Sequence, residues 1–309
     1  MHFGWMAHLR IAYRYFAQAV RDGSIRRASE NLNIASSAVN RQLLLLEEEF
    51  GAPLFLRLPR GIKPTPEGSL VLEYIRRWQD QDRVLEEEIA ALRGGVRGTI
   101  RIAAAESITE TILPQAMSEF REQYPKVDFT LISGDNFFLT SELTSKEAEV
   151  VIAFDVQDRL RASFVHEITS PLGIICSPNH PLAAKKEVSL ADCSFYPMII
   201  PGDAWLQNSG LSGIMSDAIR DEQIAVRAER PGMLKAMVAS GIGVAMLTYL
   251  GVEREIDEGR LSWVPLVSGI IRPAVISVLV PKDWTPATSS RVFLDILIRE
   301  LSAARVGPT

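Results

Sequence analysis

The sequence predicts an α/β protein made of a small helical head, one long helix and a larger body of alternating strands and helices. Three observations predict it. Residues 9–50 hold three short segments with apolar residues at helical spacing, residues 65–93 hold one much longer segment, and after residue 98 β-rich runs alternate with helical ones. A chain of 309 residues is long enough for two or three domains of this kind.

Composition and charge limit the function classes. Hydrophobic residues make up 47% and charged residues 23% of the chain, as in ordinary globular proteins. No stretch approaches 18 uninterrupted apolar residues, and the opening MHFGWMAHLR lacks the basic and apolar regions of a leader, so we expect a cytoplasmic protein with no membrane partner. The net charge is −5, yet residues 1–66 carry nine Lys and Arg against five Asp and Glu. A basic head on an acidic body suggests a local nucleic-acid contact, although such an excess also occurs on ordinary solvated surfaces.

The head has the spacing of a helix-turn-helix. The expected segments are a helix over Leu9–Arg21 stopped by Asp22-Gly23, a helix capped by Ser24 and ending at Leu32, a tight turn at Asn33-Ile34, and a helix over Ala35–Phe50 ended by Gly51. Two helices joined by such a turn, with a third packed across them, form the DNA-binding helix-turn-helix arrangement.

The last of these helices has two different faces. Its buried stripe is expected to hold Val39, Leu43, Leu46 and Phe50. The opposite face carries small and polar side chains and one cation, which suit a major groove about 12 Å wide. The candidate DNA-binding residues on it are Ser36, Ser37, Asn40 and Arg41. An ordinary surface helix is the alternative.

The segment LFLRLPRGIKPTPEG follows this helix and predicts a β-hairpin wing. Its basic residues Arg57, Arg60 and Lys63 are expected to reach the DNA backbone or the minor groove. A basic loop that serves only as soluble surface is the alternative.

A long helix then begins at Thr65-Pro66 and runs to about Arg93. Residues on one side of it alternate at spacings of four and three, as in a coiled coil interrupted by an aspartate: Val71, Ile75, Trp78, Asp82, Leu85, Ile89 and Leu92. This seam favours dimerisation, with burial inside the same chain as the alternative. In the preceding helix, Leu44 or Leu45 must be exposed or covered by another element. We therefore expect three domains: the winged helix-turn-helix over 1–66, the long dimerisation helix over 67–95, and the ligand-binding region of strands and helices over 96–309.

The body is expected to contain two sub-domains. The predicted strands are TIRIAAA, VDFTLIS, EVVIAF, FVHEI, LGIICS, FYPMII, VAMLT and AVISVLV, and the predicted helices cover Ser107–Tyr124, Leu206–Arg220, Met233–Ser240 and Ser289–Arg305. Strand–helix repetition predicts parallel sheets with helices on both faces. Two such sub-domains facing each other across a cleft would bind a ligand at the carboxyl ends of their strands.

Catalytic and metal chemistry have little support in the sequence. Of four histidines, His2 and His8 lie in the N-terminal segment, and no G-x-S-x-G, Walker or H-E-x-x-H motif occurs. Cys176 and Cys193 lack metal-site spacing and are expected in the core. We therefore expect no catalytic residues, no metal and no cofactor. The alternative to a DNA-binding regulator is a solute sensor whose head makes protein contacts.

The run RASENLNIASSAVNRQLLLLEEEFGAPLFLR resembles the helix-turn-helix of LysR-type transcriptional regulators, whose pattern is A-A-x-x-L-x-V-S-Q-P-A-V-S-R-Q-I-x-x-L-E-E-x-L-G followed by x-x-L-F-x-R. Residues at the expected positions are Ala28, Leu32, Ala38, Val39, Arg41, Gln42, Leu46, Glu47, Gly51, Leu54, Phe55 and Arg57, with Thr65 and Gly68 after them. The chain departs from this pattern at Ala35-Ser36-Ser37, where Ser-Gln-Pro is usual, and at Asn40, where Ser is usual. Leu44 and Leu45 stand where the family commonly has a basic residue.

The resemblance implies an effector domain similar to periplasmic solute-binding proteins, with two sub-domains that the chain crosses twice and a small molecule between them. By position, the implied ligand-binding residues are Ser107, Asp135, Pro201 and Asp203. Ser107 as a helix cap and Asp135 as a turn residue are the plainer alternatives, and an acidic Asp135 or Asp203 suits an amino or hydroxyl group better than a carboxylate. The expected partners are double-stranded promoter DNA, a small-molecule effector, the chain itself in a homodimer or homotetramer, and RNA polymerase.

Overall fold

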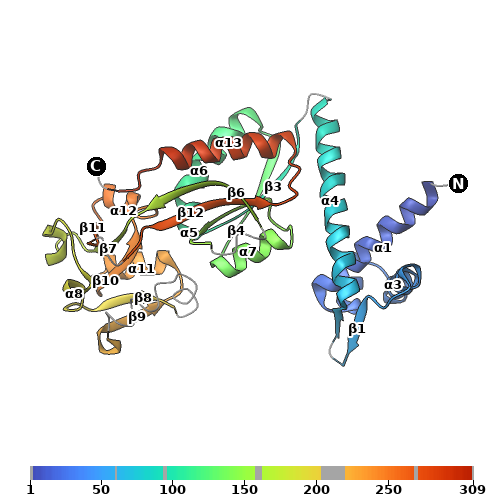
Figure 1. Ribbon diagram of the computed structural model, residues 1–309, viewed down its shortest axis with the longest axis horizontal. Coiled ribbons are helices and arrows are strands. Elements are labelled where there is room, and N and C mark those ends of the chain that lie inside the picture. Colours follow the sequence, from blue (N-terminus) through green and yellow to red (C-terminus); the bar gives the residue numbers. More distant parts are fainter. Residues whose placement is uncertain are drawn as a thin grey trace. The chain divides into compact units, whose positions relative to one another are not determined.

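The computed structural model describes residues 3–59, 61–92, 96–156, 162–202, 220–267 and 271–307 (Figure 1). The chain divides into two compact units, Met1–Arg83 and Val84–Thr309, and the division falls inside the long helix α4. Each unit has a hydrophobic core of its own. We call Met1–Arg83 the head and Val84–Thr309 the body.

The head contains the predicted helix-turn-helix and wing. Its elements are α1 (Phe3–Asp22), α2 (Ile25–Leu32), α3 (Ser36–Phe50), β1 (Phe55–Leu58), β2 (Gly61–Pro64) and the first part of α4 (Pro66–Leu92). The helix expected from Leu9 begins earlier, at Phe3. The antiparallel pairing of β1 with β2 confirms the predicted hairpin.

The expected capping residues set the helix ends. The Ser24 hydroxyl accepts a hydrogen bond from the N–H of Arg27 and so caps α2. Asn33 and Gly51 end α2 and α3 in the left-handed conformation, with φ of 55° and 65°. These local interactions fix the length of the turn between α2 and α3, and hence the angle at which α3 leaves it.

The head core confirms most of the predicted stripe of α3. Val39, Leu43 and Leu46 are at most 1% exposed, whereas Phe50 is 46% exposed, so its predicted burial is wrong. Periodicity identifies the buried face of a helix, but it does not show where along the helix the neighbouring elements end. The rest of this core comes mainly from α1, the wing and the start of α4: Ala12, Tyr15, Phe16, Ala19, Ala28, Leu54, Phe55, Val71, Leu72 and Ile75.

The predicted seam of α4 is split between two environments. Val71 and Ile75 pack into the head core at 9% and 2% exposure. Further along, the apolar side chains are between 41% and 88% exposed: Trp78, Leu85, Ile89 and Leu92. Only this second part of the seam is open to another chain.

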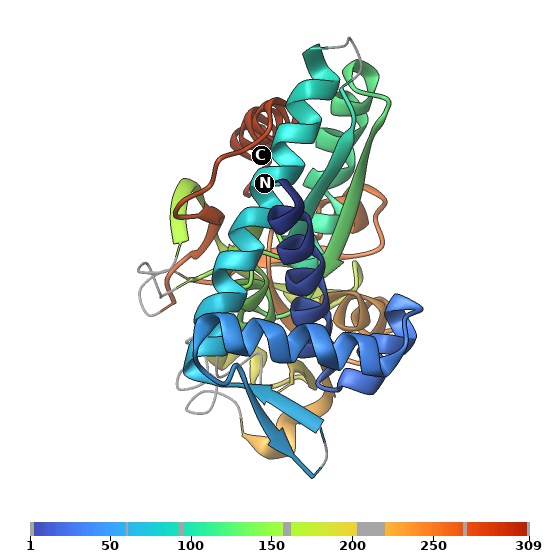
Figure 2. The ribbon, with the colours of Figure 1, turned by 90° about the vertical axis from the view of Figure 1, so that its right-hand side faces the viewer.

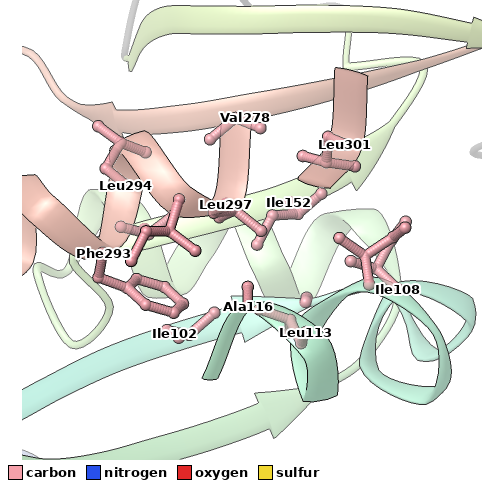
Figure 3. Packing of buried hydrophobic residues seen from close by; sticks show 14 of the residues in the cluster. Ile102, Ile108, Leu113, Ala116, Ile152, Val278, Phe293, Leu294, Leu297 and Leu301 are labelled. Atoms are coloured by element: carbon pink, nitrogen blue, oxygen red, sulfur yellow. The ribbon is translucent and has the colours of Figure 1, made fainter. Parts of the chain in front are cut away.

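The first sheet of the body has the order β4-β3-β5-β12-β6 in the described residues. Its strands are β3 (Gly98–Ala104), β4 (Val127–Ser133), β5 (Val150–Phe154), β6 (Ala162–Ser170) and β12 (Ala274–Pro281). The helices that accompany it are α5 (Glu106–Glu110), α6 (Ile112–Gln123), α7 (Asn136–Thr144) and α13 (Thr288–Ala303). Because side chains alternate along a strand, Ile102 packs with α6 and α13 on one face, and Ala103 packs with α7 on the other. Figure 3 shows the first of these faces, with Phe293 and Leu297 of α13 lying over Ile102 and Ile152.

The second sheet has the order β11-β7-β10-β8-β9 in the part of the body that the structure describes. Its strands are β7 (Leu172–Cys176), β8 (Met198–Pro201), β9 (Ile224–Ala228), β10 (Val244–Thr248) and β11 (Ser262–Pro265). The helices beside it are η1 (Pro181–Ala184), α8 (Leu190–Cys193), η2 (Asp221–Gln223), α11 (Pro231–Ala239) and α12 (Glu253–Asp257). The chain passes from the first sheet to the second between β6 and β7 and returns between β11 and β12, so the implied double crossing is confirmed.

Two expectations about the body need correction. The sheets are mixed, because β12 runs antiparallel to both β5 and β6, and β7 antiparallel to β10 and β11. The helix expected over Ser107–Tyr124 is broken at Thr111 into α5 and α6, since Pro114 has no N–H for the carbonyl of Glu110. Most of the helix expected over Leu206–Arg220 lies outside the described residues.

Candidate nucleic-acid interface and ligand cavity

The outer face of α3 is open to solvent. Ser36, Ser37 and Arg41 are exposed, and Asn40 is half-buried. Hydroxyl, amide and guanidinium groups of this kind can bond base edges or phosphates. One turn further on, Leu44 and Leu45 are each 47% exposed, so both leucines are open and the exposed surface of α3 becomes apolar there.

A shallow hollow joins α3 to the wing, which lies beside that helix in Figure 2. Its lining residues are Ser24, Ile25, Arg26, Ser36, Ser37, Asn40, Arg57, Leu58, Gly61 and Ile62. Nη2 of Arg57 donates a hydrogen bond to Oδ1 of Asn40 over 3.3 Å, which links the wing to the outer face of α3. Sequence reasoning missed Arg26, although its position just after the cap Ser24 was a usable signal.

The wing separates two of its predicted contact residues. Arg57 pairs with Ile62 and Leu56 pairs with Lys63, so Arg57 and Lys63 extend from opposite faces of the hairpin. Arg57 lines the hollow and Lys63 does not. Arg60 lies outside the described residues.

The backbone holds the wing against the turn between α1 and α2. The N–H of Ile62 donates to the carbonyl of Gly23 over 2.9 Å. Gly61 lies so close to that carbonyl that a Cβ at this position would be 2.3 Å from its oxygen, and its φ of 122° also favours glycine. The position of Arg57 beside α3 therefore depends on the fold of the whole head.

A cavity of about 500 Å³ lies between the two sheets of the body. Its lining follows the carboxyl ends of strands in both sheets: Ala105, Glu106 and Ser107 after β3, Ser133 to Asn136 at the end of β4, Phe154 and Asp155 at the end of β5, Gly202 after β8, Glu229 to Pro231 after β9, and Leu247, Thr248, Leu250, Gly251 and Val252 at the end of β10. Leu172 and Ala274 complete it. The volume and the mixture of apolar and polar groups are typical of a small-molecule site.

The structure brings together two of the four ligand-binding candidates. Ser107 and Asp135 both line the cavity. Pro201 is buried in β8 and does not line it, while the next residue, Gly202, does. Asp203 lies outside the described residues.

The structure also tests the plainer roles considered for these residues, Ser107 as a helix cap and Asp135 as a turn residue. The N-cap of α5 is Ala105 rather than Ser107, so the capping role considered for Ser107 is wrong. Asp135 does cap a helix, because its Oδ1 accepts a hydrogen bond from the N–H of Phe138 over 2.7 Å at the start of α7. Capping uses one carboxylate oxygen, and Asp135 still lines the cavity.

Sequence reasoning missed several polar lining residues: Glu106, Asn136, Asp155, Glu229, Arg230 and Thr248. Each stands at or just after the end of a strand. The rule that selected Ser107 and Asp135 would have found Glu106 and Asp155, because their strands were predicted. Glu229 and Arg230 follow β9, which was not predicted.

Two carboxylates of α5 connect the sub-domains. Oε1 of Glu106 accepts a hydrogen bond from the N–H of Gly232, at the start of α11, over 3.1 Å. Glu110 forms an ion pair of 2.6 Å with Lys235, which is 6% exposed. Lys235 also lies 3.2 Å from the carboxylate of Glu255. These contacts hold α11 against the mouth of the cavity.

Asp155 directly follows β5 and lies in an unusual environment. Its φ is 49°, and its Oδ1 accepts a hydrogen bond from the N–H of Val275 over 2.9 Å. Burial raises the pKa of Asp155 above its ordinary value, and the bond from Val275 and the nearby Arg272 oppose that rise. A desolvated carboxylate at the edge of a cavity attracts a hydrogen-bond donor or a cation.

Metal clusters and membrane spans are both missing from the described residues. Among them, no group of three or more His, Cys, Asp or Glu side chains is arranged to hold a metal ion. No helix in that part of the chain is long and apolar enough to span a membrane.

A winged helix-turn-helix followed by a two-lobed body with a cavity between its lobes defines a DNA-binding protein that carries its own ligand-binding body. Residues 12–69 match the family described as "Bacterial regulatory helix-turn-helix protein, lysR family", and residues 93–302 match the "LysR substrate binding domain". The chain belongs to the LysR family of transcriptional regulators. This membership confirms the expected class and its ligand-responsive, DNA-binding function, and excludes an enzyme.

One curated relative and two solved structures are consistent with this family assignment. The chain is 26% identical over 248 residues to the RuBisCO operon transcriptional regulator of Allochromatium vinosum, and the match covers 80% of this chain and 82% of that protein. A full-length OxyR variant from Pseudomonas aeruginosa has the same fold, with a TM-score of 0.69 and 15% identity over 96% of both chains. Full-length CbnR, solved as a complex with its target DNA, matches with a TM-score of 0.61 and 18% identity over 94% of this chain and 99% of that one.

Proposed function

We propose that α3 enters the major groove of promoter DNA with its outer face. The observation that carries this proposal is the exposed group of Ser36, Ser37 and Arg41 beside the hollow that Arg57 completes. Small hydroxyl side chains allow close approach to base edges, and a guanidinium binds guanine or phosphate through a fork of N–H donors. Lys63, on the other face of the wing, would contact the backbone from a different side.

The chain acts as a dimer through α4. Apolar residues form an exposed stripe along this helix: Leu70, Tyr74, Trp78, Leu85, Ile89 and Leu92. At 100° per residue these positions fall within about a third of the helix circumference, so a second helix can cover all of them. The departure from the predicted seam is that Leu70 and Tyr74 take the places of Val71 and Ile75, which the head core uses.

A small molecule in the cavity would bias the body between two arrangements of its lobes. The lobes are joined by the two crossings and by the contacts from Glu106 and Glu110 to α11. A ligand that binds one arrangement more tightly shifts the population toward it, and the α4 dimer would convert that shift into a change in head spacing. RNA polymerase is the expected further partner, and the bacterial cytoplasm the expected place of action, since the promoter is there. Sedimentation of the full-length protein distinguishes a dimer from a tetramer.

Footprinting of the DNA upstream of the protein's own gene tests the proposal. Two symmetric heads should protect two half-sites in a near-palindrome, with centres about 10 bp or a multiple of that apart. A crude extract of small metabolites should alter the spacing or extent of protection. Protection of a single half-site would contradict the dimer, and the absence of protection at low ionic strength would contradict the DNA-binding role of this face.

A further inference from the structure

The charge of the cavity lining is strongly unbalanced. Among the described lining residues, Glu106, Asp135, Asp155 and Glu229 are acidic and only Arg230 is basic. Arg230, Asp135 and Glu229 are exposed, so water and salt weaken their fields, whereas Glu106 and Asp155 are half-buried and act more strongly on a bound ligand. A ligand therefore enters a field that favours positive charge.

At the N-termini of the two longer helices beside the cavity, a carboxylate of the chain already accepts a hydrogen bond from a backbone N–H. Such N-termini are the usual receptors for carboxylate and phosphate groups. At the start of α11 the N–H of Gly232 donates to Glu106, and at the start of α7 the N–H of Phe138 donates to Asp135. An acidic ligand at either of these two N–H groups would have to displace a carboxylate of the chain itself.

Two further backbone N–H groups near the cavity follow the same pattern. The N–H of Gly251, a lining residue, donates to Oε2 of Glu253, and the N–H of Val275, next to the lining residue Ala274, donates to Asp155. Each carboxylate keeps further lone pairs that can accept a bond from an ammonium or guanidinium N–H. At these four N–H groups the chain's own acids take the place that an anion would occupy, and their remaining lone pairs are acceptors for a cation.

The cavity lining also contains apolar side chains. The lining includes Phe154, Leu172, Leu247, Leu250 and Val252, and the volume is about 500 Å³. These residues can cover a short hydrocarbon part of a ligand. Taking charge and lining together, we propose that the effector is a small cationic molecule, an amine or guanidine with a hydrocarbon portion, rather than a carboxylic acid. This proposal rests on the proposed function, namely that the cavity holds the effector.

Thermal-shift measurements on the full-length protein with charge-matched probes test it. The probes are agmatine, benzylamine and cyclohexylmethylamine, each at the same ionic strength as benzoate and cyclohexanecarboxylate. A ligand that binds only the folded protein raises its melting temperature, so we expect a rise with at least one amine and none with the carboxylates. A rise with the carboxylates, or no rise with any amine, would overturn the inference.

Conservative variants test whether the amine binds in the cavity. Glu106→Gln keeps an oxygen that accepts from the N–H of Gly232, and Glu229→Gln changes an exposed side chain, so both should fold. Each should raise the dissociation constant of the stabilising amine about tenfold, which corresponds to about 1.4 kcal/mol. Glu222→Gln, an exposed carboxylate of the same lobe outside the lining, is the matched control and should leave it unchanged. Equal effects of all the variants would assign the amine to general surface charge and overturn the proposal.

Failure of this inference is distinguishable from failure of the proposed function. If carboxylates stabilise the protein and alter the footprint, the cavity is an effector site of the opposite charge class. If neither class of probe stabilises the protein and a metabolite extract leaves the footprint unchanged, the effector role itself is contradicted.

Discussion

At the scale of single residues, burial decides the chemistry of the two cysteines. Cys176 and Cys193 are both fully buried in the second lobe, as the sequence predicted. Burial raises the pKa of Cys176 to about 11, and burial, with a smaller contribution from Asp192, raises that of Cys193 to about 12. Because the thiolate is the reactive form, neither side chain should act as a redox sensor.

Alkylation with iodoacetamide checks this prediction. Relative to the ordinary thiol pKa of 9.0, the shift of Cys176 lowers its thiolate fraction at neutral pH about 100-fold. Mass spectrometry should find both thiols unmodified in the folded protein and fully modified in concentrated urea. In the unfolded chain the thiols ionise first, so the free energy of unfolding should fall as the pH rises from about 9 toward 11. Rapid modification of the native protein would contradict the buried placement.

Residue roles were predictable where a local interaction defines them. Ser24, Thr65 and Gly51 set helix ends through contacts within a few residues, and each lies where the sequence placed it. Phe50 and Ser107 were misjudged because burial and capping there depend on distant neighbours and on the precise start of a helix.

At the scale of elements, the start of α4 depends on a close approach to the wing. The Oγ1 of Thr65 accepts a hydrogen bond from the N–H of Gly68 and donates one to the carbonyl of Pro53. A Cβ at Gly68 would lie 2.0 Å from the carbonyl oxygen of Leu54, so the backbone would have to move to admit a side chain.

We predict that Gly68→Ala lowers the free energy of unfolding of the head by about 3 kcal/mol, near the upper range of overpacking costs. Gly51→Ala is the comparison, because a Cβ there meets open space and only the left-handed backbone opposes it, at about 1 kcal/mol. Urea unfolding followed by circular dichroism measures both. A Gly68 variant no less stable than the Gly51 variant would refute the close contact.

The exposed stripe of α4 gives a second prediction at this scale. Leu85 is 58% exposed and central among the apolar residues that we assign to the dimer. Leu85→Glu should raise the dimer dissociation constant at least about tenfold, since a charge would be buried without a partner. Sedimentation equilibrium measures the constant.

Gln79→Glu provides the control, because Gln79 is exposed and points away from the stripe. It should leave the dimer intact. A Leu85 variant that dimerises like the unmodified protein would show that α4 pairs through another face or not at all.

Elements with strong periodicity were predicted and weak ones were not. β5 and β7 are continuous apolar runs, whereas β9 contains Arg227 and the four residues of β11 include Ser262 and Pro265. In α7, Leu139 and Leu143 are buried but Phe137 is 76% exposed, so apolar residues on both sides hide the helical pattern. Interrupted apolar runs and mixed exposure therefore account for the missing elements.

At the scale of the whole molecule, strand direction could not be predicted from local pattern. β12 joins the first sheet only after the chain has passed through the second lobe, and this return makes it antiparallel to β5 and β6. The cavity arises from the same connectivity, because both lobes direct carboxyl ends of strands toward it. The alternation of strands and helices predicted such a site, but its acidic lining required residues from both lobes to be seen together.

The central claim is that the outer face of α3 binds duplex DNA. The most direct test is the salt dependence of promoter binding by the unmodified protein and by Arg41→Ala, with Arg121→Ala as a control at an exposed arginine of α6. We expect Arg41→Ala to weaken binding at least about tenfold at physiological salt without changing the melting temperature, and to flatten the logarithmic salt slope by about 0.9 for each phosphate interaction that the substitution removes. An Arg41 variant with unchanged affinity and slope would contradict the claim.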